Sequence, residues 1–183
     1  ITGHLVFNSY VGEGFFFSKP RFYLALFSYT KGWFVYTPIA VFGLFGLLMF
    51  DKKANDFRFL APVFILLNMY VVFSWWCWWY GGGFSQRALV DSYPILALGF
   101  AALLTKVLKM KALKLTVLPL MFLVMSFNLF QTWQYYSQLI HWDSTTKELY
   151  WSVFLKTKQP ENFNDLLKTP DLGAAKEGKI KYY

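Results

Sequence analysis

The chain has 183 residues, of which 56% are hydrophobic, 22% are aromatic and 15% are charged. Soluble globular domains average about 25% charged residues, so this composition excludes a soluble domain and is typical of a chain embedded in lipid. The net charge of +8 does not indicate a nucleic-acid partner, because the basic residues lie mostly in loops and in the C-terminal tail. A single cysteine, Cys77, excludes an intrachain disulfide. No acidic, His or Cys cluster has metal-ligand spacing, so we expect neither a metal ion nor another cofactor.

Four hydrophobic segments follow an N-terminal segment, residues 1–32, which is expected to be extracytoplasmic or interfacial. Crossing the hydrocarbon core of a bilayer as a helix takes roughly 20 mainly apolar residues. The segments that approach this length are 33–50, 59–79, 88–104 and 115–135. The sequence therefore predicts an all-α integral membrane protein with four transmembrane helices in residues 33–135.

Two short basic loops separate pairs of these spans and give the expected orientation. Residues 51–58 and 105–114 together carry six lysines and one arginine. Short loops rich in Lys and Arg are retained in the cytoplasm, so both loops should lie inside. This prediction places the N-terminal segment, loop 80–87 and the tail together on the outer face, with both ends of the chain extracytoplasmic.

The tail, residues 136–183, is polar but contains one amphipathic segment. Residues 145–156 can form one amphipathic helix, in which we expect Trp151 and Phe154 to be buried. Its apolar residues are Leu149, Trp151, Val153, Phe154 and Leu155. Asp143 or Ser144 is the expected N-cap, since their short side chains accept hydrogen bonds from the first turn. We expect this helix to lie on the outer membrane surface or to pack on an extracytoplasmic protein partner.

Residues 80–87, with the sequence YGGGFSQR, place three glycines immediately before a span. Without Cβ atoms the backbone of Gly82 and Gly83 can approach a ligand closely, and the helix that follows offers free N–H groups with partial positive charge. Arg87 gains nothing from that positive end, so it is expected to face a carboxylate or a phosphate. The alternative is an ion pair with Asp91, one helical turn later.

Three phrases stand out along the chain. They are LFSYTKGWFVYTP at 26–38, WWYGGGFSQR at 78–87 followed by Asp91 and Pro94, and HWDSTTKELYW at 141–151. Together they resemble the later part of bacterial membrane glycosyltransferases similar to protein O-mannosyltransferases. The resemblance implies a GT-C fold that transfers a sugar from a polyprenyl-phosphate donor on the outer face of the inner membrane. The family's acidic catalytic residue lies in a first outer loop that nothing here matches, so this chain would be the C-terminal part of the enzyme.

On this interpretation the ligands are membrane lipid and a polyprenyl-phosphate-linked sugar, and the catalytic residue is unknown. The donor phosphate is expected to be bound by Arg87, Lys31, Gly82, Gly83 and Gln86. An alternative from another class is a non-catalytic membrane anchor or accessory subunit of an envelope complex, whose tail would hold a protein partner. The chain begins with isoleucine rather than methionine, so we expect its reading frame to continue upstream.

Overall fold

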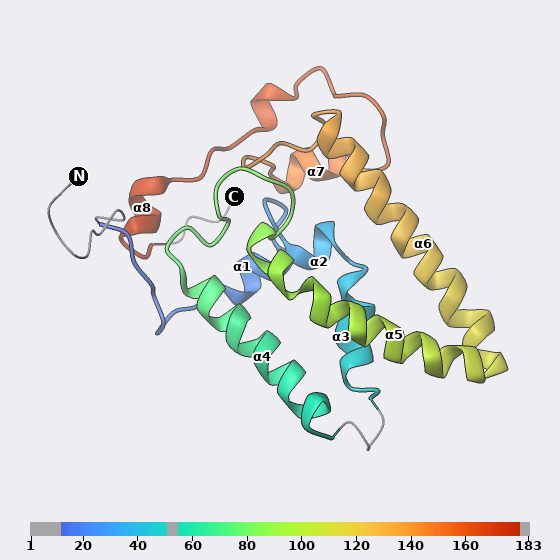
Figure 1. The fold of residues 1–183 in the computed structure, drawn as a ribbon. Coiled ribbons are helices and arrows are strands. Elements are labelled where there is room, and N and C mark those ends of the chain that lie inside the picture. Colours follow the sequence, from blue (N-terminus) through green and yellow to red (C-terminus); the bar gives the residue numbers. More distant parts are fainter. Residues whose placement is uncertain (1–11, 51–54, 180–183) are drawn as a thin grey trace, which may run out of the picture.

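The structure is a computed structural model that describes residues 12–50 and 55–179. Within these residues the regular structure is helical, apart from an isolated bridge between Phe15 and Trp75. Figure 1 shows the long helices extending away from the segment that carries α7 and α8. The described helices are α1 (Phe22–Phe27), α2 (Trp33–Tyr36), α3 (Ala40–Leu47), α4 (Asn55–Ser74), η2 (Arg87–Ser92), α5 (Tyr93–Lys109), α6 (Lys111–Tyr136), α7 (Lys147–Val153), η3 (Asn164–Leu166) and α8 (Leu172–Lys176).

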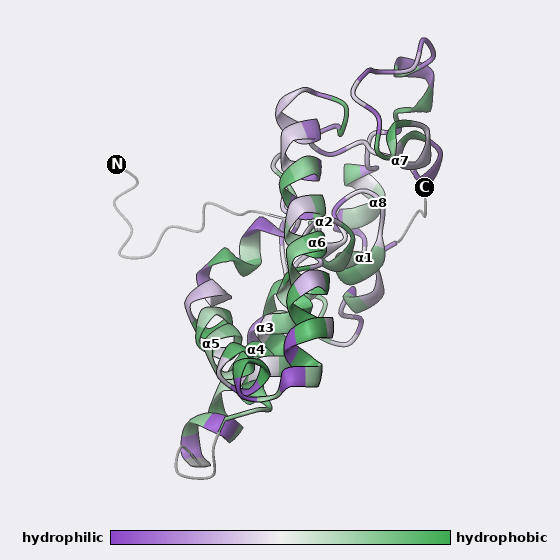
Figure 2. Ribbon diagram, turned by 90° about the vertical axis from the view of Figure 1, so that its right-hand side faces the viewer, coloured by the Kyte–Doolittle hydropathy of each residue, from purple (hydrophilic) through white to green (hydrophobic). Residues whose placement is uncertain are grey.

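Three helical stretches of the described chain are long and apolar enough to cross a membrane. They are Asp56–Ser74 in α4, Arg87–Lys109 in η2 and α5, and Lys111–Tyr136 in α6. Figure 2 shows hydrophobic colour along these helices. Many of their large side chains point outward, as with Leu115 and Phe122, whose exposed fractions are 68% and 67%. Lipid tails are as apolar as these side chains, so this outward face suits a bilayer rather than water.

Residues 33–50 do not form the continuous first span that the sequence predicts. Helix α2 ends at Tyr36 and α3 begins at Ala40. Pro38 lies between them and restricts the residue before it, Thr37, whose φ of −135° and ψ of 55° are not helical. At about 1.5 Å per residue, the 8 residues of α3 span roughly 12 Å, less than half of the hydrocarbon core.

The fourth span is therefore not confirmed. The placement of both chain ends on the outer face requires an even number of crossings, so it depends on whether the α2–α3 segment crosses the bilayer. That placement stays a prediction. The other three expected spans agree with the structure to within a few residues, except at the end of α4.

Helix α4 ends at Ser74 rather than at Trp79, because backbone N–H groups of the N-terminal segment form hydrogen bonds with its last two carbonyl groups. The N–H of Phe16 donates to the carbonyl of Ser74 at 2.6 Å, and the N–H of Arg21 donates to the carbonyl of Phe73 at 2.8 Å. The tryptophan-rich stretch that follows is consequently non-helical. The chain leaves the helix there and forms the glycine-rich loop.

Helix α3 crosses α5 at a contact between glycines. Gly43 and Gly46 on α3 face Gly99 on α5, and a Cβ on Gly46 or Gly99 would overlap a backbone carbonyl of the opposite helix. Small residues allow helix backbones in membranes to approach this closely and to gain van der Waals contact. The crossing positions α5, and with it the 3-10 helix η2 at its start.

In the tail, the N-cap of α7 is Thr146 and not Asp143 or Ser144. The Thr146 hydroxyl accepts a hydrogen bond from the N–H of Leu149 at 3.1 Å. Asp143 and Ser144 lie too early in the chain to reach that turn, and the Ser144 hydroxyl donates instead to the Asp143 carboxylate at 2.6 Å. The prediction of a helix is confirmed, but the predicted cap is wrong.

The buried face of α7 consists of one aromatic side chain, that of Tyr150, and two aliphatic ones, those of Leu149 and Val153. Trp151, by contrast, is 53% exposed. The expectation that Trp151 is buried is therefore wrong. Helix α7 packs beside the end of α6, as Figure 1 shows.

Three amide side chains on α6 join this helix to α2 and to the tail. They are spaced three residues apart and so lie along one side of the helix. The Asn128 amide donates to the Tyr36 carbonyl at 3.1 Å, that of Gln131 to the Tyr150 hydroxyl at 3.1 Å, and that of Gln134 to the Val153 carbonyl at 2.7 Å. The C-terminal part of α6 is thus held by hydrogen bonds to α2 and the tail, while most of the rest of its surface is apolar.

We predict that Gly99→Ala destabilises the fold by about 1–3 kcal/mol, because the new Cβ meets the Gly43 carbonyl and forces α3 and α5 apart. Thermal unfolding in detergent micelles measures the effect. Gly14→Ala is the matched control, since a Cβ at Gly14 meets nothing within 4 Å. Equal melting temperatures for the two variants would contradict the importance of the glycine contact.

We also predict that the two ends of α6 are reached from opposite sides of the membrane. Its 26 residues correspond to about 39 Å of helix, which exceeds the hydrocarbon thickness. In a Cys77→Ala background, Asp56→Cys and Lys109→Cys should react with an impermeant maleimide from one side and Lys158→Cys from the other. Labelling of Lys109→Cys and Lys158→Cys from the same side would show that α6 does not cross.

Candidate functional site

Lys31 lies in the turn between α1 and α2, and its side chain is turned into the protein with only 1% exposed. The turn is tight: the N–H of Gly32 donates to the Ser28 carbonyl at 2.8 Å, and the N–H of Lys31 donates to the Ser28 hydroxyl at 3.2 Å. A Cβ at Gly32 would overlap the backbone of Ser28, so the turn requires glycine there. The tight turn at Lys31 and Gly32 therefore directs the ammonium group of Lys31 into the protein.

The Lys31 ammonium donates a hydrogen bond to the carbonyl oxygen of Gly83, in the glycine-rich loop. This loop has an unusual backbone, because Tyr80, Gly81, Gly83 and Ser85 all have positive φ. Gly83, at φ 144°, occupies a region that side chains rarely allow. Lys31 thus forms its hydrogen bond with the loop residue whose backbone conformation most strongly requires glycine.

Burial lowers the pKa of Lys31 from its usual value of 10.5 to about 8. The Asp143 carboxylate opposes this shift by favouring the charged ammonium, and the Arg87 guanidinium adds to it by repulsion. The charge on Lys31 at neutral pH therefore depends on a carboxylate contributed by the tail. This dependence joins the tail electrostatically to the α1–α2 turn.

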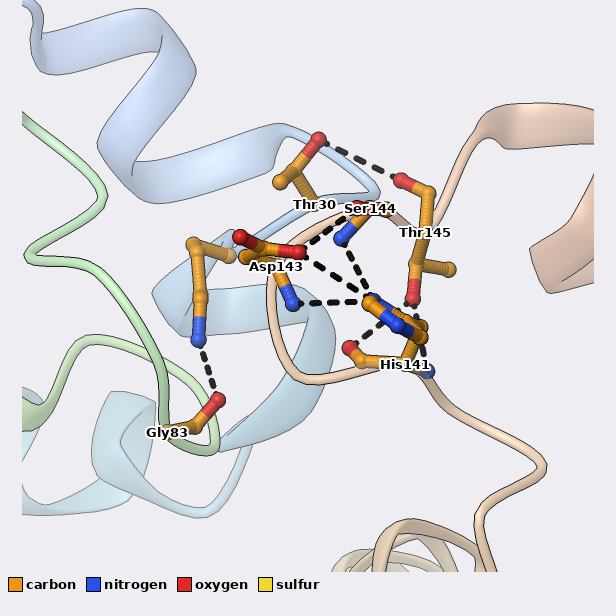
Figure 3. Close-up of polar contacts among 7 residues, drawn as sticks. Thr30, Gly83, His141, Asp143, Ser144 and Thr145 are labelled. Atoms are coloured by element: carbon orange, nitrogen blue, oxygen red, sulfur yellow. Dashed lines mark hydrogen bonds and ion pairs between the residues drawn. The ribbon is translucent and has the colours of Figure 1, made fainter. Parts of the chain in front are cut away.

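The tail segment from His141 to Thr146 forms a compact turn, drawn in Figure 3. The imidazole Nδ1 of His141 accepts the backbone N–H groups of Asp143 and Ser144, at 3.3 and 3.1 Å. The Asp143 carboxylate lies 3.2 Å from the same Nδ1.

This turn packs directly on the two other segments. The Thr30 hydroxyl donates to the Thr145 carbonyl at 3.2 Å, beside Lys31. The Trp142 ring lies against Gly82, where a Cβ would be 3.0 Å from its Cε3 atom. The three phrases that stand out in the sequence, 26–38, 78–87 and 141–151, are consequently brought into one cluster.

Arg87 lies at the edge of this cluster and is exposed. Its side chain packs near Gly83, where a Cβ would lie 3.2 Å from the Arg87 Cδ. In the described part of the chain its guanidinium forms no ion pair or hydrogen bond, including with Asp91. The reason is local: η2 is a 3-10 helix of about three residues per turn, so Asp91 lies roughly 120° around the axis from Arg87.

Gln86 lies inside the protein rather than at the surface. Its side chain is 1% exposed, and neither its amide nitrogen nor its amide oxygen has a hydrogen-bond partner among the described residues. A buried unsatisfied amide costs roughly 1–3 kcal/mol per group, so such groups are usually met by water or a ligand. Next to it, the Ser85 hydroxyl accepts from Thr37 at 2.9 Å and ties the loop to the α2–α3 break.

The residues expected around a phosphate therefore divide into two sets. Arg87 and Gly82 lie at the surface of the cluster, whereas Lys31 and Gln86 lie beneath the loop that contains Gly83. Sequence reasoning missed the partners of Lys31 and Gly82 in the tail, namely Asp143 and Trp142. The signal that could have found them is the phrase HWDSTT, which combines an acid and two ring side chains with hydroxyl groups.

The cluster offers one exposed guanidinium, a glycine-rich loop and a surface of aromatic and imidazole rings. The described residues include no group of three His, Cys, Asp or Glu side chains that could hold a metal ion. Comparison of the chain with protein-family models, with curated proteins and with solved structures finds no match.

We predict that the stability of the wild type rises with pH between about 8 and 10.5 through Lys31. In that interval the unfolded chain binds more protons than the folded one, because the folded pKa is depressed. The full shift corresponds to about 3 kcal/mol. Denaturant titrations in micelles should show this rise in the difference between wild type and Lys31→Met.

Lys147→Met removes an exposed lysine of the tail and serves as control. Its difference from the wild type should stay flat over the same pH interval. A flat difference for Lys31→Met as well would mean that Lys31 is solvated in solution.

Proposed function

We propose that this chain is the membrane part of a glycosyltransferase and binds the phosphate of a polyprenyl-phosphate-linked sugar. The observation that carries the proposal is the Arg87 guanidinium, which is exposed and unpaired within the described residues at the start of a candidate membrane span. Lys31 fixes the loop beside it. A cation kept in place without a protein partner is suited to an anionic ligand.

The position along the helix favours a lipid phosphate. Arg87 begins the stretch Arg87–Lys109, one of the three that could cross a membrane. A polyprenyl phosphate has its chain in the bilayer and its anion at the headgroup level, where the first residue of such a span lies. The planar guanidinium can bind two phosphate oxygens at once, which an ammonium cannot.

Lys31 has a supporting role in this proposal. Its ammonium is directed at the Gly83 carbonyl, so it stabilises the loop and adds positive potential without touching the ligand. The unsatisfied amide of Gln86 marks a polar space under the same loop, which water or an oxygen of the ligand could fill. The catalytic residue itself is not assigned.

The distribution of charge supports the outer face of a bacterial inner membrane as the location. Lys106, Lys109, Lys111 and Lys114 are exposed at the junction of α5 and α6, at the far end from Arg87. Positive residues in short loops favour the cytoplasm, which would place the Arg87 cluster outside. The tail also packs on α6 and on the glycine-rich loop, which favours a part of the site over a free docking segment for another protein.

We predict that Arg87→Gln weakens binding of a polyprenyl monophosphate about 10- to 100-fold, because one charge-assisted contact of roughly 1.5–3 kcal/mol is lost. Arg87→Lys should restore part of the affinity, because lysine keeps the positive charge but lacks the planar guanidinium that binds two phosphate oxygens. Binding is measured on the chain in lipid nanodiscs containing either the phosphate or the uncharged polyprenol.

Lys158→Gln, which removes an exposed cation elsewhere in the tail, should bind as the wild type does. The melting temperature of Arg87→Gln should also be unchanged, since no described protein group pairs with the guanidinium. Unaltered phosphate affinity in Arg87→Gln would sink the proposal.

A further inference from the structure

A cavity of about 370 Å³ lies between the end of α6 and the tail. It falls within the range of roughly 300–1,000 Å³ that is usual for small-molecule sites. Its polar and aromatic wall consists of Tyr135, Tyr136, Gln138, His141, Trp142 and Gln159.

The wall of this cavity contains no Lys, Arg, Asp or Glu side chain. Besides the aromatic residues it has two glutamines and His141, whose Nδ1 accepts two backbone N–H groups. The remaining lining residues, Ile140 and Phe163, are apolar and buried and form its floor. A phosphate or carboxylate would find no lysine or arginine here, so the cavity fits a neutral ligand.

Two rings at the cavity are unusually open to solvent. Tyr136 is 81% exposed and Trp142 is 51% exposed. An exposed ring offers a flat apolar face, which matches the C–H face of a pyranose sugar while leaving the sugar hydroxyls free. A purely apolar ligand is disfavoured because amides and an imidazole share the same wall.

Those polar groups are fixed and retain hydrogen-bonding capacity. The Gln159 amide nitrogen donates to the Gln138 carbonyl at 2.8 Å, which leaves its amide oxygen as an acceptor. Gln138 has a φ of 60°, so the turn that carries it has a left-handed backbone conformation. The His141 Nε2–H remains as a donor, since Nδ1 is used by the backbone. Fixed donors and acceptors around flat rings are what vicinal hydroxyl groups require.

The cavity adjoins the glycine-rich loop through two of its rings. Trp142 lies against Gly82, and the Tyr135 ring centroid is 5.3 Å from that of Phe84. We propose that this cavity binds a neutral monosaccharide or disaccharide, with Trp142 and Tyr136 as the stacking platform. The inference goes beyond phosphate binding by Arg87 and does not require it, because a free saccharide carries no phosphate.

The test is saturation-transfer NMR on the chain in lipid nanodiscs, because maltoside detergents would themselves supply a disaccharide. The probes are glucose, mannose, galactose, N-acetylglucosamine and maltose, with glucuronic acid as the charged comparison. At least one neutral sugar should receive saturation, and glucuronic acid should receive markedly less. Trp142→Ala and Tyr136→Ala should each weaken binding of that sugar about tenfold.

Trp151→Ala is the matched control, because Trp151 is 53% exposed and lies outside the cavity wall. It should leave sugar binding unchanged. Tyr136→Ala keeps the test decisive if Trp142→Ala disturbs the loop, since the Tyr136 ring is almost fully exposed. Absence of transfer to every neutral sugar, or equal transfer in Tyr136→Ala and wild type, would overturn the proposal. Arg87-dependent phosphate binding would survive either result.

Discussion

The buried ammonium of Lys31 is the group on which the arrangement of the cluster depends. A charged ammonium with 1% of its side chain exposed is stable only if protein groups replace the water it has lost. Those groups come from segments far away in the chain, the Gly83 carbonyl by a hydrogen bond and the Asp143 carboxylate through its field. Satisfying one cation therefore requires the loop and the tail to meet at the α1–α2 turn.

Packing elsewhere in the fold helps to hold the loop and the tail at the α1–α2 turn. The glycine contact between α3 and α5 fixes α5 and, at its start, the 3-10 helix η2 that carries Arg87, and the amides of α6 fix the tail. Neither contact allows the segments to shift easily. In the glycine contact, backbone packs against backbone, and the amides of α6 form buried hydrogen bonds. The glycine-rich loop is thus supported from both of its ends and from below, and Arg87 is left at the surface without a described partner.

The phosphate and saccharide proposals concern neighbouring parts of one structural unit. Arg87 packs near Gly83, while Trp142 lies on Gly82 and Tyr135 on Phe84. A ligand carrying a phosphate next to a sugar would meet the Arg87 cation near Gly83 and the rings and amides of the cavity near Gly82 and Phe84. Separating charge recognition from sugar recognition in this way lets each be altered by mutation without the other.

The sequence by itself indicated a membrane protein and determined the positions of three candidate membrane-spanning helices, the amphipathic segment of the tail and the loop that carries Arg87. These follow from hydropathy and local residue preferences, which act over short stretches of chain. Tertiary structure decided the rest: the end of α4 at Ser74, and the burial of Lys31 and Gln86. It also decided that Asp143 and Trp142 belong with the glycine-rich loop. Such features depend on which distant segments supply hydrogen bonds and charge, and no local pattern encodes that.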